Sequence, residues 1–229
     1  ETVKGRHPGP IFSLSHFYYR PHFTEQVEIS LKYFGRTVLP DSSTVTAFLG
    51  AIYFFDKWLE RKRFTIYDLR FMISLIFTAA ALLLKPFAIF FILPMIYLVF
   101  EKYGLAFLKK RQFWIFAVLS LMPLIAWRLW MFQYPEGIPQ SGWLLNGGNI
   151  RFKGAFFQWI FAERIGKLIL GYWGLPLLIL GILLKLSKKS YLFFLSFLVS
   201  SLLYITVIAR GNIQHDYYQI FIMPSIAIY

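Results

Sequence analysis

The chain has 229 residues, of which 58% are hydrophobic, 21% aromatic and only 15% charged. A soluble domain of this length needs a more polar surface, so the composition indicates an integral, multi-pass membrane protein. The formal net charge is +13, but the basic residues form short clusters between apolar runs. This pattern is typical of loops at a membrane surface and argues against nucleic acid as a partner. The absence of cysteine excludes disulfides and thiolate metal sites.

Residues 1–40 mix aromatic and polar side chains and contain no apolar run long enough to cross a bilayer. We expect an N-terminal interfacial or loop region there, followed by a transmembrane helical domain at 41–229. The chain begins with Glu1 and ends at Tyr229 inside an apolar segment, so we expect a truncated piece of a longer protein.

The apolar segments predict an all-α fold, a polytopic transmembrane helix bundle with about seven membrane segments. A span needs about twenty residues, so the first three segments are short unless flanking residues contribute. The segments lie at 43–56, 71–84, 87–100, 112–131, 166–184 and 190–208, and another opens at 217.

Clusters of Lys and Arg predict which connections face the cytoplasm, because cytoplasmic loops carry an excess of these residues. The most basic stretches are 57–70, 101–111 and 185–189. We therefore expect all three on the cytoplasmic side, with the remaining connections on the outer side.

The sequence "ALLLKPFAIFFILP" places a lysine and a proline, Lys85 and Pro86, in the middle of a long apolar stretch. If the basic stretches on both sides of 71–100 are cytoplasmic, this region crosses the membrane twice and turns at Lys85. Proline disfavours helix in the residue before it and suits the first turn of the next helix. Lys85 is therefore expected at the outer interface, together with loop 132–165 and residues 209–218.

The outer loop 132–165 is the longest connection and is rich in proline and glycine. Its end predicts an amphipathic interfacial helix, because apolar residues from Phe152 to Ile160 recur at helical spacing between Arg151 and Arg164. Such a helix either packs on lipid without a site of its own or covers a cavity at membrane level.

Three cations, Lys85, Arg128 and Arg210, fall near the expected outer ends of helices. Taken singly, each is explained by a side chain that reaches up to the lipid phosphates. Taken together, they predict a site for a lipid-linked phosphate, which needs cations at headgroup depth and suits the planar fork of arginine.

The stretch "HDYY" contains His215, Asp216, Tyr217 and Tyr218 at the expected start of the last helix. One interpretation is structural, because an acidic residue is favourable at a helix N-terminus and tyrosines form an aromatic belt. The other is polar recognition of a sugar or phosphate by the histidine and a tyrosine hydroxyl.

Before the first apolar segment, Arg36 and Asp41 lie in "YFGRTVLPD". Asp41 is expected at the start of a helix, and a capping role alone would explain an acidic residue at this position. The four histidines are not spaced as a metal motif, and nucleotide-binding and hydrolase motifs are missing from the sequence. We therefore identify no cofactor, and a divalent metal ion has no support in the sequence.

Three motifs, "YFGRTVLPD", "ALLLKPFAIFFILP" and "HDYYQIFIMP", together resemble those of the C-type (GT-C) integral membrane glycosyltransferases. The resemblance is to the branch that contains protein O-mannosyltransferases and the aminoarabinose lipid A transferase, and it covers about residues 31–229. It implies transfer of a sugar from a polyprenyl-phosphate donor, with inversion, on the outer face of a bacterial inner or plasma membrane. The acceptor, whether protein, lipid or glycan, stays open.

One departure from the family concerns the principal catalytic carboxylate, which lies there in a first outer loop and has no match in this chain. Asp41 is a candidate, and no catalytic base is assigned. The predicted donor phosphate ligands are Lys85, Arg128 and Arg210, and the supporting polar residues are Arg36, His215, Asp216, Tyr217 and Tyr218.

Two other function classes remain open. A lipid or small-molecule transporter or flippase is expected to carry charges near the bilayer midplane and internal repeats. A non-catalytic membrane scaffold is expected to tolerate loss of the outer-face charges.

Overall fold

The computed structural model describes residues 40–61, 65–134, 136, 142–184 and 188–229, and over these ranges the chain is helical and contains no strand. The all-α class is confirmed. The N-terminal region predicted at 1–40 lies, apart from Pro40, outside the described residues, and so does Arg36. The described helices belong to one compact unit, Pro40–Tyr229.

The first half of the unit contains α2 (Asp41–Leu59), α3 (Leu69–Leu84), η2 (Pro86–Ile92), α4 (Leu93–Tyr103), η3 (Gly104–Lys109) and α5 (Arg111–Met131). The second half contains α6 (Gly142–Asn146), η5 (Gly147–Phe152), α7 (Gly154–Phe157), η6 (Gln158–Ile169), α8 (Gly174–Leu183), α9 (Lys188–Val207), α10 (Ala209–Gln214), η7 (Asp216–Ile222) and α11 (Met223–Ile228). Among the described residues, three helices are long and apolar enough to cross a membrane: Pro86–Lys109, Arg111–Met131 and Ser190–Val207.

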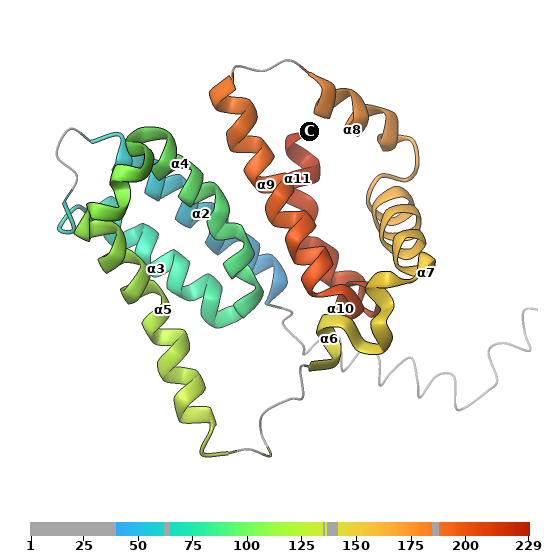
Figure 1. Ribbon diagram of the computed structural model, residues 1–229, viewed down its shortest axis with the longest axis horizontal. Coiled ribbons are helices and arrows are strands. Elements are labelled where there is room, and N and C mark those ends of the chain that lie inside the picture. The colour runs from blue at the N-terminus through green and yellow to red at the C-terminus, as the bar shows by residue number, and fades with distance from the viewer. Residues whose placement is uncertain (1–39, 62–64, 135, 137–141, 185–187) are drawn as a thin grey trace, which may run out of the picture. The chain divides into compact units, whose positions relative to one another are not determined.

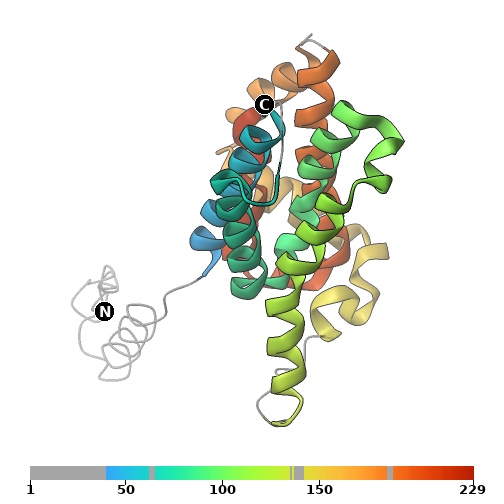
Figure 2. The ribbon, with the colours of Figure 1, turned by 90° about the vertical axis from the view of Figure 1, so that its left-hand side faces the viewer.

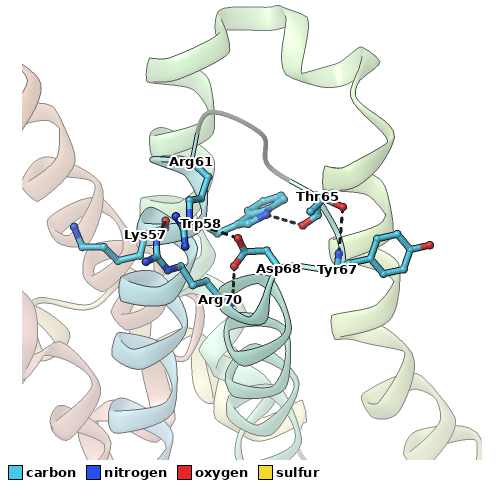
Figure 3. A network of polar contacts seen from close by, with 7 residues as sticks. All are labelled: Lys57, Trp58, Arg61, Thr65, Tyr67, Asp68 and Arg70. Carbon is cyan, nitrogen blue, oxygen red and sulfur yellow. Dashed lines mark hydrogen bonds and ion pairs between the residues drawn. The ribbon is translucent and has the colours of Figure 1, made fainter.

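Helices α2 and α3 pack against each other, and a polar network holds the connection between them (Figure 3). The fully buried Trp58 donates its indole Nε1–H to the carbonyl of Thr65 at 3.0 Å. Asp68 caps α3 by accepting from the backbone N–H of Arg70 at 2.8 Å. The guanidinium of Arg70 donates back to the carbonyl of Lys57 at 3.0 Å, so the two helix ends are fixed to each other.

The break predicted at Lys85 is present. Helix α3 ends at Leu84, Lys85 is extended with φ −148° and ψ 116°, and Pro86 opens η2. From there the chain runs back as a helix to Lys109, with Gly104 in a left-handed conformation (φ 54°) between α4 and η3. The basic stretch predicted as a loop at 101–111 is therefore helical over most of its length.

The membrane segment predicted at 166–184 is not one continuous helix, because the helix breaks between Ile169 and Gly174 and the axis bends by 107°. Gly171 and Tyr172 have positive φ values of 54° and 62°, which end the helix. The freed backbone groups are paired: the N–H of Tyr172 donates to the carbonyl of Gly166 at 2.7 Å. Such pairing is what makes a helix break tolerable in an apolar setting.

The predicted interfacial helix at 151–167 corresponds to α7 and η6. Its apolar face matches the predicted spacing in part, since Phe156 and Ile160 are buried. Phe152 and Trp159 are exposed instead. The buried side of this helix is therefore narrower than the sequence pattern indicates.

Stacked aromatic rings join α2, η2, α9 and η7 in the core. Phe48 of α2 stacks on Phe91 of η2 with ring centroids 4.5 Å apart. Tyr204 of α9 stacks on Phe221 of η7 at 5.3 Å, and Phe221 also lies 6.3 Å from Phe48. These rings connect segments far apart in the sequence and fix the start of η7 beside the break at Lys85.

The helix ends gather into two groups (Figures 1 and 2). The start of α2, the turn between α3 and η2, α6 and α10 lie at one end. The α2–α3 connection, η3 and the start of α9 lie at the opposite end. We call the first group the Lys85 end and the second the basic end, because the second carries Lys57, Arg61 and Arg70 and the basic stretch 101–111.

Candidate functional site

An ion pair between Lys85 and Asp41 occupies the centre of the Lys85 end. Asp41 lies in the first turn of α2, where the helix dipole favours an anion, and its side chain is fully buried. Its Oδ1 accepts from the ammonium of Lys85, whose side chain is 14% exposed. Asp41 Oδ2 is buried and has no hydrogen-bond partner within the described part of the chain. The pair joins the start of α2 to the turn between α3 and η2.

Aromatic rings of η7 surround the same ammonium. Lys85 Nζ lies 4.4 Å from the ring centroid of Tyr218, 5.1 Å from that of Tyr217 and 5.6 Å from that of Phe221. The negative ring faces attract the cation, and the attraction is stronger where water is excluded. Lys85 is therefore held by one carboxylate from α2 and several rings from η7.

Burial lowers the pKa of the Lys85 ammonium from its ordinary value, while the hydrogen bond and the charge of Asp41 oppose the shift. Desolvation is the larger effect. A desolvated cation interacts strongly with any anion that reaches it, since the local dielectric is low. Removing either partner alone leaves an uncompensated buried charge.

His215 connects this cluster to a neighbouring cavity. Its ring stacks on Tyr217 with centroids 5.2 Å apart and meets Tyr218 edge-on at 5.5 Å. On its other side it lies 5.9 Å from the ring of Trp143 in α6. The residue is extended and separates α10 from η7, which is why one side chain contacts both regions.

The cavity beside His215 measures about 420 Å³ and is lined by Trp143, Gly147, Gly148, Arg210 and Gln214. The amide oxygen of Gln214, oriented to satisfy both groups, accepts from Nε and Nη2 of Arg210 at 3.2 Å each. An aromatic ring, a guanidinium and an amide are the kinds of group that orient a polar ligand in a pocket.

Buried polar side chains hydrogen-bond to the backbone on both sides of the turn between α10 and η7. The amide of Gln219 donates to the backbone carbonyl of Asn212 at 2.7 Å and to its side-chain oxygen at 3.1 Å. The hydroxyl of Tyr204 donates to the carbonyl of Tyr218 at 3.2 Å. Sequence reasoning missed these residues, although polar side chains on both sides of "HDYY" in an apolar setting were a usable signal.

The structure brings together Asp41, Lys85, His215, Tyr217 and Tyr218 of the residues predicted for the site. Arg210 faces the adjoining cavity. The cavity residues Trp143 and Gln214 were not predicted, because nothing in the sequence around them marks them as neighbours.

Asp216 takes a different position from its neighbours in the sequence. Its carboxylate pairs with the guanidinium of Arg164 in η6, and its side chain is 65% exposed. Arg164 also donates to the carbonyl of Ile213 at 2.7 Å. Asp216 therefore helps to attach η6 to the turn between α10 and η7.

Arg128 does not converge with the other two predicted cations. It is exposed in the last turn of α5, a helix that packs mainly on α3 and η3 and ends away from α10 and η7 (Figure 1). Its side chain has no part in the cluster around Lys85. Of the three predicted cations, Lys85 lies in the cluster with Asp41 and the rings of η7, and Arg210 lines the cavity together with Trp143.

Over the described ranges, no three His, Asp or Glu side chains gather as ligands for a metal ion. The groups available for chemistry at the Lys85 end are thus one carboxylate, two cations, an imidazole and several aromatic rings. Function has to be argued from this geometry, because comparisons of the chain with protein-family models, curated proteins and solved structures each found no match.

Proposed function

We propose that the chain is part of a polytopic membrane glycosyltransferase that moves a sugar from a polyprenyl-phosphate donor to an acceptor on the outer face. The observation that carries this proposal is the position of Lys85. It is a desolvated cation at a helix break, and the rings of Tyr217 and Tyr218 around it contact His215. His215 in turn lies against Trp143, which lines a cavity together with Arg210. The family resemblance of the three motifs supports the same assignment.

A bilayer environment is supported by the exposed apolar surface. Helix α5 exposes Val118, Met122, Ile125 and Leu129, each by more than half of its surface. A soluble protein rarely exposes so continuous an apolar face. In this proposal α2, α3, Pro86–Lys109, α5, the bent pair of η6 and α8, α9, and η7 with α11 form about seven membrane segments.

Sidedness follows from the basic residues. Cytoplasmic connections carry an excess of Lys and Arg, and the basic end of the bundle has that composition. The Lys85 end then faces outward. The Asp, Glu, Lys and Arg residues of α2, α3, α4, α5 and α9 lie in first or last turns, within the described ranges. In η6, Glu163 and Arg164 lie inside the helix, and Arg164 pairs with Asp216. This distribution favours chemistry at one membrane surface over passage through the middle.

In the proposed reaction the donor phosphate is the leaving group. Lys85 and Arg210 bind its oxygens and stabilise the negative charge that develops as the glycosidic bond breaks. Asp41 fixes the position of Lys85, and His215 and Tyr218 supply polar support. The cavity between Trp143 and Gln214 accommodates the sugar. A carboxylate must accept the proton of the acceptor, and we assign none here.

The test is binding of polyprenyl phosphate to the purified chain in detergent micelles. Lys85→Ala should weaken binding about ten- to hundred-fold, the effect of losing one charged hydrogen bond worth about 1.5–3 kcal/mol. Lys188→Ala is the matched control, because Lys188 is an exposed cation at the other end of the bundle. Equal binding by both variants would contradict the proposal.

Loss of Lys85 also leaves Asp41 buried and unpaired, which can destabilise the fold by itself. The double variant Asp41→Asn with Lys85→Met removes both charges and should recover most of the thermal stability. Binding of polyprenyl phosphate should remain weak in this double variant. If binding returned together with stability, the ion pair would be structural and the donor site would lie elsewhere.

A further inference from the structure

A second cavity lies at the basic end, away from the Lys85 cluster. It measures about 250 Å³ and is formed between α2, α4, η3 and α5. Its lining is apolar and includes Phe55, Met95, Val99, Phe107, Phe113 and Phe116. Such a lining offers no hydrogen-bonding group to a polar ligand, and it suits a hydrocarbon chain.

The cavity is open to the outer surface of the helix bundle. Ile96 of α4 and Trp114 of α5 line it and are also 48% and 56% exposed. The exposed Leu108 of η3 lies beside this opening, since the indole of Trp114 donates to its carbonyl at 2.9 Å, and Leu105 of the same helix is also exposed. Tryptophan with exposed leucines is typical of the boundary between lipid headgroups and acyl chains.

Exposed cations adjoin two lining residues of this cavity in the sequence. The lining residues Phe107 and Phe113 flank the basic run 109–111 in the sequence. Lys109 and Arg111 are exposed, at the end of η3 and the start of α5. The N-terminus of α5 adds positive potential at this point. The segment that carries these cations therefore also contributes part of the apolar lining.

We infer that this cavity takes an acyl chain of an anionic phospholipid, and that Lys109 and Arg111 bind its phosphate. Within a bilayer an acyl chain gains little hydrophobic energy by leaving other lipid tails, so the cavity alone selects no particular lipid. The charge at the rim provides the selection, because an anionic headgroup is attracted to it more strongly than a zwitterionic one. This inference requires that the chain lies in a membrane, and it is independent of glycosyl transfer.

The test is photolabelling of the chain in phosphatidylcholine nanodiscs. A small fraction of the lipid carries a diazirine on its acyl chain and is either phosphatidylglycerol or phosphatidylcholine. After irradiation, mass spectrometry maps the labelled residues. The phosphatidylglycerol probe should label the cavity residues of α4 and α5 several-fold more than the phosphatidylcholine probe.

Two variants and one control distinguish the effect of the rim charges on labelling from the effect of cavity packing. Lys109→Gln with Arg111→Gln should reduce labelling by phosphatidylglycerol to the level of phosphatidylcholine. Arg61→Gln with Lys188→Gln removes two exposed cations of the same end and should keep the preference. Ala117→Leu fills the cavity and should reduce labelling inside it by both probes. Labelling of the outward-facing Val118 should not change.

Equal labelling of the cavity by both probes, or an unchanged preference after loss of Lys109 and Arg111, would overturn the inference. Absence of label from the cavity would show that another segment or protein covers it. The double variant should still bind polyprenyl phosphate at the Lys85 end. The result of this experiment therefore distinguishes failure of the lipid-site inference from failure of the proposed transferase function.

Discussion

The ammonium of Lys85 is held from several sides. It is paired with a buried carboxylate and lies against rings of η7, while one oxygen of Asp41 has no partner within the described ranges. A cation in this position has already lost much of its hydration shell on folding. A phosphate that binds there therefore displaces little water from the ammonium. The same desolvation lowers its pKa, which makes its charge sensitive to pH.

Binding of polyprenyl phosphate should therefore weaken at alkaline pH. Only the protonated amine attracts the phosphate, so binding is lost as pH rises through the pKa of Lys85, which lies below its ordinary value of about 10.4. The charge of the phosphate is constant in that range, since its second pKa is about 6. Lys85→Arg keeps the charge and should give a flat profile. Titrating binding from neutral to alkaline pH measures this, and identical profiles for the two proteins would contradict it.

At the scale of elements, the site depends on the close approach of α10 to η7. Gly211 of α10 is buried, and a Cβ at this position would lie 2.9 Å from the ring of Tyr218, 3.0 Å from Leu144 and 3.1 Å from Ile208. Tyr218 cannot move away freely, because its ring also contacts Lys85 and His215. The absence of a side chain is therefore what allows the two elements to meet.

Gly211→Ala should lower the thermal stability of the chain in detergent. The overpacking should cost about 1–3 kcal/mol, which outweighs the gain of about 1 kcal/mol from replacing glycine in a helix. Gly154→Ala is the matched control, because a Cβ on that helical residue meets nothing within 4 Å. Thermal unfolding of the two variants measures the difference. A melting temperature for Gly211→Ala equal to that of the control would mean that α10 and η7 can separate at little cost.

At the scale of the whole molecule, the two ends of the helices carry different chemistry. One end has the buried ion pair, the aromatic rings and the polar cavity, and the other has exposed cations around an apolar cavity. If the chain crosses a bilayer, these ends meet different compartments. The proposed transfer reaction and the proposed lipid site would then act on opposite faces of the membrane.

Single cysteines test this arrangement directly, because the chain has none of its own. Lys153→Cys and Lys188→Cys replace exposed lysines, the first at the end of η5, which contacts α10, and the second at the start of α9. In sealed inside-out and right-side-out vesicles, a membrane-impermeant thiol reagent should modify Cys at 153 only from outside and Cys at 188 only from the cytoplasmic side. Modification of both from the same side would exclude the proposed topology.

Local features of the fold were predictable from the sequence. The break at Lys85 follows from the stereochemistry of Pro86, which acts only on its immediate neighbours. The helical segment after His215 was predicted from the apolar run that opens at 217. The all-α class followed from the length of the apolar runs. The helix break at Gly171 and Tyr172 was missed, because a positive φ in an apolar run leaves no trace in the hydrophobic pattern.

The composition of the candidate site was decided by tertiary structure. The sequence predicted the same role for Lys85, Arg128 and Arg210, because all three are cations near expected helix ends. Only the packing of α5 on α3 and η3 separates Arg128 from the others. Asp41 meets Lys85, and Asp216 meets Arg164, across long stretches of chain. Such pairs depend on which helices pack together and at what rotation, and that is set by the aromatic core as a whole and not by any one segment.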